Sequence, residues 1–200
     1  IQSVVEPPRW IHLANSAGTL SGRLGAGNLV RCGIATYGLS PSGDVPVPEE
    51  FEPVLSLVSR VGRRFTLEAG EGVSYGLTYR SDRPEELATI PIGYGDGVTR
   101  DLSNRGWFVA NGTRLPIRGR VCMDQTVVGN ADALAAGDEV IVIGSMSGAM
   151  NLDDAAAMTG TINYELATRV MARVPRLYYR GEQPVAWDHT LLGEHGYVGT

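Results

Sequence analysis

Residues 107–116 read WFVANGTRLP, which places two short apolar runs on either side of Asn111-Gly112. Asn and Gly both tolerate a positive φ angle, so this stretch predicts a tight β-hairpin. Similar β-branched runs, separated by Gly, Pro and Asn, recur from Val54 to Gly144. Because many short strands at this spacing are typical of antiparallel barrels and sandwiches, the sequence predicts a mainly β domain.

Upstream of this region, residues 1–39 show an α/β pattern. Apolar strands are predicted at Trp10–Ala14 and at Leu29–Ile34, with a short helix after Ser16 between them. Two such α/β units cannot close a barrel or a sheet on their own. The sequence therefore predicts only part of a larger α/β structure here.

The two regions are separated by SPSGDVPVP at residues 40–48, which is dense in turn formers and stiff prolines. Such a stretch favours a linker or a boundary. We place the domain border within it, so that residues 1–44 form the α/β part and residues 45–200 form the β domain with short helices.

Two helices and a tail are predicted towards the C-terminus. Asn151 can cap a helix that carries acidic residues in its first turn. A second helix is expected at Ile162–Arg173, before Pro175 stops it. Residues 181–200 mix polar residues, glycines and isolated apolar residues, so we expect little regular structure there.

The basic residues are all of one type. The chain has 17 of them, all arginine, against 22 acidic residues, and the formal net charge is −5. Because the arginines are scattered, we expect neither nucleic acid nor an anionic membrane surface as a partner. No apolar run approaches the roughly 20 residues that span a bilayer. Without lysine, the chain also has no side-chain amine that could hold an aldehyde cofactor as a Schiff base.

Cysteine and histidine positions predict no metal site. Cys32 and Cys122 are too few for a disulfide framework and lie outside any CxxC spacing, so we expect a reducing compartment, the cytoplasm. His12, His189 and His195 have no metal-like spacing. We interpret these histidines as structural or solvated.

Three glycine-rich segments combine tight turns with functional side chains: GEGVSYG at residues 70–76, IPIGYGDG at 90–97 and GRVCMDQ at 119–125. Tyr75 and Tyr94 each adjoin glycine, and a phenol exposed in this way can serve as a general acid or base. The alternative is that both are amphipathic strand-end residues that fill the mouth of a barrel. A strand is predicted directly after the first segment, at Gly76–Tyr79.

Arg31 and Gly33 follow an apolar strand of the α/β part. Such a strand end commonly binds phosphate through backbone N–H groups, and a glycine allows close approach. It can equally be an ordinary strand end with a solvated arginine. Ser16 can likewise donate to a phosphate, or only cap the next helix.

Taken in order, six segments resemble alanine racemase, a fold-type III pyridoxal-phosphate enzyme with an N-terminal α/β barrel and a C-terminal β domain. The segments are HLANSAG (12–18), VRCGIATYGLSP (30–41), GVSYGLTY (72–79), IPIGYGDG (90–97), GRVCMDQ (119–125) and INYELATRVMARVPRLYY (162–179). Any one is weak, but the six keep their order over about 170 residues. The resemblance implies the last βα units of a TIM-type barrel followed by an antiparallel β domain.

The resemblance further implies pyridoxal phosphate as the cofactor. The family's phosphate-binding residues are matched by Ser16, Gly33, Ile34 and Tyr164. Arg31 matches the partner of the pyridine nitrogen. Because an arginine is permanently cationic, it disfavours a second positive charge on that nitrogen and weakens the ring as an electron sink. This suits racemisation rather than transamination or decarboxylation.

Residues of the β domain match the family's catalytic and substrate-binding groups. Tyr75 resembles the tyrosine that exchanges the α-proton on one face of the substrate, while the cofactor lysine serves the other face. Met123, through its backbone N–H, resembles a binder of the substrate carboxylate, and Asp124 is the acid beside it. The family's narrow access corridor, which favours a side chain as small as that of alanine, is matched by Tyr94, Arg100, Arg120 and Ile162.

A homodimer is also implied, in which the β domain of one subunit completes the active site of the other. Tyr75, Tyr94 and Met123 would then act in trans, whereas the residues that bind the cofactor phosphate act in their own subunit. The early barrel strands and the lysine that bonds the cofactor have no counterpart here. The chain begins at Ile1 without a methionine, so we expect that sequence precedes it and that the chain alone is inactive.

The expected activity is the interconversion of L- and D-alanine, which provides D-alanine for peptidoglycan. Two alternatives stay open. One is an amino-acid racemase of broader substrate range on the same scaffold. The other is a free β domain that binds or oligomerises without catalysis.

Overall fold

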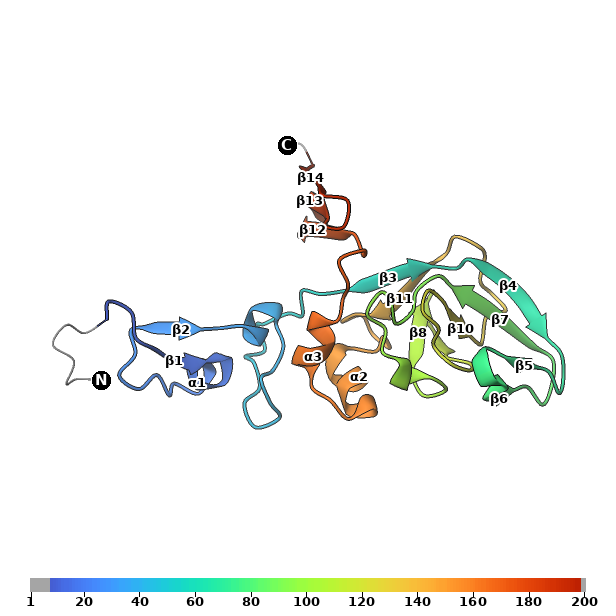
Figure 1. Cartoon of the computed structure of the whole chain (residues 1–200), viewed down its shortest axis with the longest axis horizontal. Helices are drawn as coiled ribbons and strands as arrows, with labels where there is room; N and C mark the ends of the chain where they lie inside the picture. Colours follow the sequence, from blue (N-terminus) through green and yellow to red (C-terminus); the bar gives the residue numbers. More distant parts are fainter. Residues whose placement is uncertain (1–7, 199–200) are drawn as a thin grey trace. The chain divides into compact units, whose positions relative to one another are not determined.

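The computed structural model describes residues 8–198 and divides the chain into two compact units. The first unit ends at Leu55 and the second begins at Ser56. In Figure 1 the first unit is drawn from blue to cyan, and the second continues through green and yellow to red. The domain border between residues 44 and 45 stays a prediction from the sequence.

The first unit contains one βαβ element. Strand β1 (His12–Asn15) leads into helix α1 (Ser16–Leu20), and strand β2 (Leu29–Arg31) returns parallel to β1. Parallel strands place their C-terminal ends at the same edge, so the residues after β1 and β2 meet there. The 3₁₀ helix η1 (Ile34–Tyr37) follows β2 after Cys32 and Gly33. The α/β pattern predicted for this region is confirmed, but the second strand ends at Arg31 and not at the predicted Ile34, which already belongs to η1. Residues 1–7 lie outside the described residues.

The proline-rich stretch after η1 folds back onto that helix. Gly38 has a φ of 69°, and a Cβ there would lie 1.9 Å from the carbonyl oxygen of Glu52. The N–H of Val54 donates to the carbonyl of Tyr37 at 3.1 Å. Residues 40–48 are therefore part of a loop of the first unit, and the far end of this loop packs against the C-terminal end of η1.

The second unit is built mainly from antiparallel strands. One sheet has the order β10-β7-β4 and a second has the order β3-β11-β8-β9, while β5 and β6 form a small ribbon. The strands are β3 (Leu57–Arg60), β4 (Arg63–Leu67), β5 (Gly72–Val73), β6 (Tyr79–Arg80), β7 (Glu85–Ile90), β8 (Trp107–Ala110), β9 (Thr113–Pro116), β10 (Thr126–Val128) and β11 (Glu139–Ile143).

The two larger sheets are connected along both sides. On one side the chain runs from β3 through Val61 and Gly62 into β4. On the other side Ile117, just after β9, forms a bridge with Val128 of β10. Fully buried apolar residues from five strands fill the interior: Leu87, Phe108, Leu115, Val128 and Val140. The prediction of a mainly β domain for this region is confirmed.

The β8–β9 hairpin forms as the sequence predicts. Asn111 and Gly112 have φ values of 49° and 73°, and Ala110 pairs with Thr113 across the turn. Two successive positive φ angles give the turn a twist that matches the right-handed twist of the strands.

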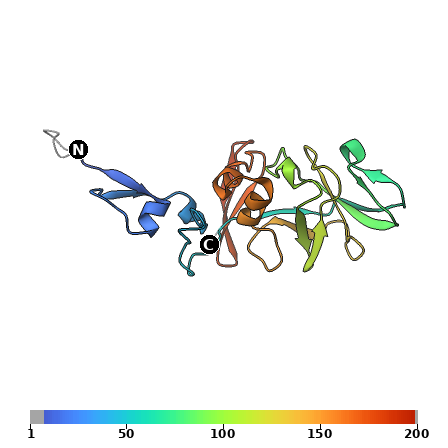
Figure 2. The same ribbon diagram turned by 90° about the horizontal axis from the view of Figure 1, so that it is seen from below.

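Two short helices follow the β strands. Helix α2 (Leu152–Thr159) begins at a capping box formed by Asn151 and Asp154, and it lies next to α3 (Asn163–Thr168) in Figures 1 and 2. The second helix is shorter than the predicted Ile162–Arg173, and its C-terminal extent was therefore wrong. The chain leaves the helix because residues 169–171 pack against the loop after β7, where the N–H of Met171 donates to the carbonyl of Asp96 at 3.3 Å.

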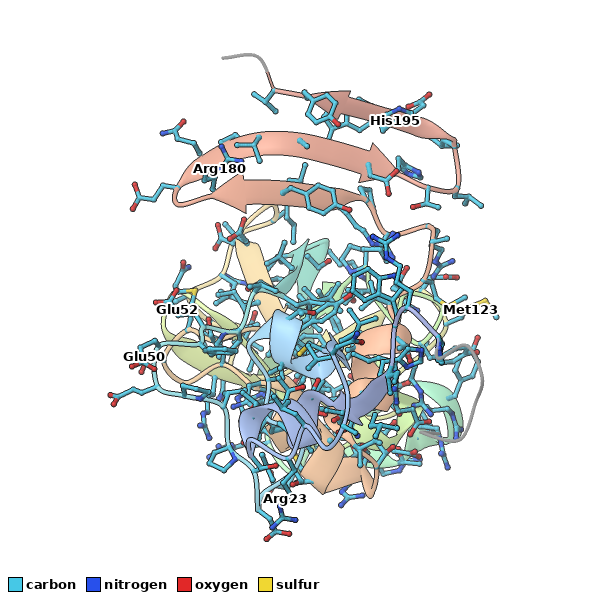
Figure 3. All side chains as sticks on the ribbon, turned by 90° about the vertical axis from the view of Figure 1, so that its left-hand side faces the viewer. Arg23, Glu50, Glu52, Met123, Arg180 and His195 are labelled. Carbon is cyan, nitrogen blue, oxygen red and sulfur yellow. The ribbon has the colours of Figure 1, made fainter. Side chains whose placement is uncertain are left out.

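The C-terminal tail forms a sheet, so the expectation of little regular structure is wrong for its described part. Strands β12 (Arg176–Arg180), β13 (Gln183–His189) and β14 (Glu194–Tyr197) pair in antiparallel order. Figure 3 shows this sheet with Arg180 and His195 labelled. Gly181 and Gly193, which have φ values of 60° and 68°, allow the two connecting turns. Within residues 8–198, every helix is too short or too polar to cross a membrane.

Candidate active site

The loop that carries Tyr75 is fixed against the loop of residues 119–125. The hydroxyl of Ser74 donates to the carbonyl of Arg120 at 2.7 Å, and its oxygen lies 3.4 Å from the sulfur of Cys122. Since Tyr75 directly follows Ser74, these contacts set the position from which its side chain projects.

The loop that carries Tyr94 is fixed against the same segment. The N–H groups of Tyr94 and Gly95 donate to the carbonyls of Cys122 and Met123, both at 2.9 Å. A Cβ on Gly93 would lie 2.1 Å from the carbonyl oxygen of Cys122, so this close approach requires glycine. The structure thus brings together three loops that the sequence shows only separately.

Tyr75 is 74% exposed. It lies between Ser74 and Gly76, which have φ values of 65° and 72°. A positive φ is unfavourable for serine and is sustained only when its surroundings hold it, as the hydroxyl contact does here. The strand predicted at Gly76–Tyr79 is wrong, because these positive φ angles form a turn and β6 begins only at Tyr79.

Met123 offers a backbone donor close to both tyrosine loops. The residue is 53% exposed and is labelled in Figure 3. Its carbonyl accepts from Gly95, whereas its N–H donates to no atom of residues 8–198. This N–H is able to bind an anionic group such as a carboxylate.

Arg173, which the sequence reasoning did not single out, connects two of these loops. Its Nε lies 2.7 Å from a carboxylate oxygen of Asp96, and its Nη2 lies 2.6 Å from one of Asp124. The hydrogen bond to Asp96, followed by that to Asp124, raises the pKa of the Arg173 guanidinium above its usual value. The carboxylate of Asp124, which is predicted to lie in the substrate-binding segment, therefore forms an ion pair with Arg173.

In the first unit, Ser16 joins the chain after β1 to the chain after β2. Its hydroxyl oxygen is buried and accepts from the N–H groups of Gly33 at 3.0 Å and Ala35 at 3.4 Å. The helix cap is supplied by the neighbouring Asn15 instead. Ile34 begins η1 beside this contact. A Cβ on Gly33 would meet no atom within 4 Å, so open space adjoins the backbone at this point.

Arg31 pairs with a histidine that the sequence reasoning interpreted as structural or solvated. Its Nη1 donates to the carbonyl oxygen of His12 at 2.5 Å and lies 2.8 Å from Nδ1 of the same residue. Both residues lie on the parallel strands β1 and β2. The contact depends on the register of the two strands, which pairs His12 with Leu29 and Asn15 with Arg31, and no local sequence signal indicates it.

The remaining predicted residues lie on other elements of the second unit. Tyr164 is half-buried in α3, and burial raises the pKa of its phenol above the usual value. Ile162 precedes α3 and is exposed, as is Arg100 in the 3₁₀ helix η3 (Arg100–Leu102). Arg120 is half-buried beside the Tyr75 loop. Among the residues that the structure describes, no three His, Cys, Asp or Glu side chains gather to hold a metal ion.

Comparisons with known proteins give one consistent family. The family model described as alanine racemase, C-terminal domain, matches residues 54–178, and that described as alanine racemase, N-terminal domain, matches residues 1–41. The curated alanine racemase of Desulfovibrio desulfuricans is 44% identical over 169 residues, which are 84% of this chain and 45% of that protein. That of Salinispora tropica is 47% identical over 182 residues, covering 88% and 48%.

Solved structures agree with the sequence relatives. Alanine racemase from Bacillus anthracis with bound L-Ala-P has a TM-score of 0.85 at 39% identity, covering 93% of this chain and 49% of that one. The Clostridium difficile 630 alanine racemase in complex with cycloserine has a TM-score of 0.82 at 37% identity, covering 90% and 48%. The chain spans about half the length of these relatives. With the family models matching both of its parts, the chain belongs to the alanine racemase family.

Proposed function

We propose that the protein to which these residues belong interconverts L- and D-alanine with pyridoxal phosphate by a two-base mechanism, and so supplies D-alanine for peptidoglycan. The single observation that carries the proposal is the outward-facing Tyr75, held on a loop that is fixed against the Met123 loop. In a chain of this family, such joined loops would supply a proton-transfer group and an anion-binding N–H to one site.

Residues of the first unit suit the phosphate of the cofactor. We assign it to Ser16 and to the backbone of Gly33 and Ile34. The open space beside Gly33 supports this, because a backbone must come close to a phosphate to donate its N–H groups. In this structure the Gly33 N–H donates to the buried hydroxyl of Ser16, so a bound phosphate would replace Ser16 as the acceptor of that N–H or accept from Ile34 beside it. Tyr164 is assigned to the phosphate only because it matches a phosphate-binding residue of the family.

Arg31 is assigned to the pyridine nitrogen of the cofactor. Its guanidinium is held by His12, and a positive charge beside the ring nitrogen disfavours a second one on that nitrogen. When bound, pyridoxal phosphate acidifies the Cα–H bond of an amino acid joined to it. The 200 residues contain no lysine, so the covalent attachment of the cofactor needs a residue outside them.

Tyr75 is assigned to proton exchange at the substrate Cα. Its phenolic oxygen takes or gives the proton on one face, and a base on the opposite face makes inversion possible. The Met123 N–H holds the substrate carboxylate, in the same segment as Asp124. Fixing the carboxylate in this way determines which face of the substrate Cα is turned towards the Tyr75 hydroxyl.

The corridor to this site is assigned to Tyr94, Arg100, Arg120 and Ile162. A narrow passage lined by bulky side chains favours alanine over larger amino acids, since one surplus methylene costs about 1–3 kcal/mol in a tight site. We further propose a cytoplasmic homodimer in which Tyr75, Tyr94 and Met123 serve the cofactor of the partner subunit. The exposure of Tyr75 and Met123 supports this, because a completed site would cover them.

The test uses the complete protein loaded with pyridoxal phosphate. We expect D-alanine from L-alanine and the reverse reaction, with kcat/KM for serine, lysine and arginine lower by about tenfold or more. Comparable turnover of those amino acids would favour the racemase of broad range. No turnover of any of them by the loaded protein would favour a β domain that only binds or oligomerises.

A further inference from the structure

Arg173 reaches across two loops that are distant in the sequence. It follows α3, and its guanidinium bonds the carboxylates of Asp96 and Asp124 through different nitrogens, Nε and Nη2. A planar guanidinium has donors in a fixed fork, so it can serve two acids at once and set the angle between them. A lysine ammonium, a point charge on a flexible stem, sets no such angle.

Each of the two acids belongs to a loop of the candidate site. The other carboxylate oxygen of Asp96 accepts from the N–H of Gly93 at 2.9 Å, which closes the turn that carries Tyr94. Asp124 directly follows Met123. Holding both acids therefore fixes the Tyr94 turn and the Met123 backbone relative to each other.

The close packing of the guanidinium against Gly95 also indicates that Arg173 fixes the two loops relative to each other. A Cβ on Gly95 would lie 2.5 Å from Nη2 of Arg173, so the guanidinium rests directly on the glycine backbone. That glycine also donates to the carbonyl of Met123 at 2.9 Å. Without Arg173, the two loops would lose the ion pairs that join Asp96 and Asp124 through one side chain.

We propose that Arg173 is a positioning residue for the substrate carboxylate: by holding Asp96 and Asp124 together, it keeps the Met123 N–H aimed at the substrate beside Tyr94. This rests on the proposed function, since it assigns a role within that site. Arg173 itself does not touch the substrate. It acts through the two loops, so its loss weakens substrate binding more than the chemical step.

The test compares Arg173→Met and Arg173→Lys in the complete, cofactor-loaded protein. We expect Arg173→Met to raise the KM for alanine about tenfold while kcat changes by less than about threefold, because the carboxylate contact acts in both ground and transition states. Arg173→Lys keeps the charge but not the fork, and we expect only partial rescue. Binding of propionate, which is alanine without its amino group, measured by titration calorimetry, should weaken in parallel with the rise in KM.

Arg64→Met is the matched control. Arg64 is as exposed as Arg173, with 38% against 37% of the side chain accessible, and it likewise contacts an acid and backbone carbonyls. Its contacts to Glu86, Asp132 and Leu134 lie outside the three site loops. We expect its removal to leave KM and propionate binding unchanged.

Hydrogen exchange gives a readout that does not depend on turnover. We expect the amides of Tyr94 and Gly95 to exchange faster in Arg173→Met while those of β7 and β8 keep their protection. Asp124→Asn tests the same clamp if Arg173→Met does not fold, and it should shift KM in the same direction.

Two outcomes would overturn the proposal. In the first outcome, the wild type racemises alanine, and Arg173→Met has the same KM, propionate binding and amide exchange as the wild type. This result would contradict the role of Arg173 and leave the proposed function intact. A fall in kcat at constant KM removes that role as well. Absence of alanine racemisation by the loaded wild type instead removes the proposed function, and with it the substrate that Arg173 would serve.

Discussion

At the scale of single residues, Tyr75 shows how the backbone sets the use of a side chain. Ser74 and Gly76 both have positive φ angles, so the chain turns sharply on each side and the tyrosine projects outward. Glycine on one side could be recognised in the sequence. The positive φ of the serine could not, because it depends on contacts with Arg120 and Cys122.

Replacement of Tyr75 tests the catalytic assignment. We expect Tyr75→Phe in the complete protein to lower racemisation by about 10²–10⁴-fold, because a proton-transfer group is lost. The free energy of unfolding should change by less than about 0.5 kcal/mol, since the side chain is exposed. Exchange of the α-proton in deuterium oxide, measured from each enantiomer, should become unequal.

The matched control for this replacement is Tyr197→Phe, which removes the hydroxyl of another exposed tyrosine. It should leave racemisation unchanged. Near-normal racemisation by Tyr75→Phe would contradict the catalytic role.

Gly93 tests the close approach of two site loops. Its Cβ position lies 2.1 Å from the Cys122 carbonyl oxygen, so Gly93→Ala must push the backbones apart. We expect the chain to lose about 1–3 kcal/mol of stability, as in other overpacked sites, measured by urea denaturation. Gly43→Ala is the control, because its added Cβ meets nothing within 4 Å. Equal stability of the two variants would show that the loops can separate at no cost.

At the scale of elements, the local sequence correctly predicted those turns and helix ends that depend only on their own residues. The Asn111-Gly112 hairpin and the start of α2 at Asn151 both form as predicted. The end of α3 and the sheet in the C-terminal tail did not follow from local sequence. One is set by packing against the loop after β7, and the other by pairing among three strands.

The capping box of α2 can be measured directly. Asn151 accepts from the N–H of Asp154 at 2.7 Å, and the Asp154 carboxylate accepts in return from the N–H of Asn151 at 3.2 Å. We expect Asn151→Ala to cost about 1 kcal/mol, a fall in Tm of roughly 2–4 °C by calorimetry. Asn151→Asp, which keeps a capping oxygen, should stay close to the wild type. A fall of the same size in both variants would argue against the cap.

A second element-scale prediction concerns alkaline pH. Tyr79 of β6 donates to Glu85 of β7 beneath Arg118, and burial followed by this hydrogen bond raises the pKa of its phenol. The folded state therefore holds the proton more tightly than the unfolded state, in which the pKa is about 10. This stabilisation is complete below pH ~10 and is lost as the pH rises through the folded-state pKa.

We expect the free energy of unfolding of the wild type to fall more steeply above pH ~10 than that of Tyr79→Phe, measured by urea denaturation across this range. The absence of lysine simplifies the measurement, because few groups other than tyrosine titrate there. Parallel curves for the two proteins would show that the Tyr79 proton does not contribute.

At the scale of the whole molecule, the proposed dimer predicts that two inactive variants restore activity when their subunits are combined. If Tyr75 acts in trans, a dimer of one Tyr75→Phe subunit and one subunit without the cofactor lysine contains one intact site and one site with both defects. We expect such mixed dimers to recover roughly half of the wild-type activity, measured after co-expression with two different affinity tags. Each homodimeric variant serves as the control. No recovery would show that Tyr75 acts within its own subunit.

The sequence by itself determined the family, the β character of the second unit, the hairpin and the helix start, because these depend on residue types at short spacing. It also determined that no lysine is present to bond a cofactor. Only the tertiary structure decided that Ser74, Gly93 and the segment around Cys122 converge, that His12 holds Arg31, and that Arg173 joins Asp96 to Asp124. The physical reason is that hydrogen bonds and ion pairs form between atoms a few ångströms apart, and residues such as Asp96 and Arg173 become neighbours only when the strands between them have paired.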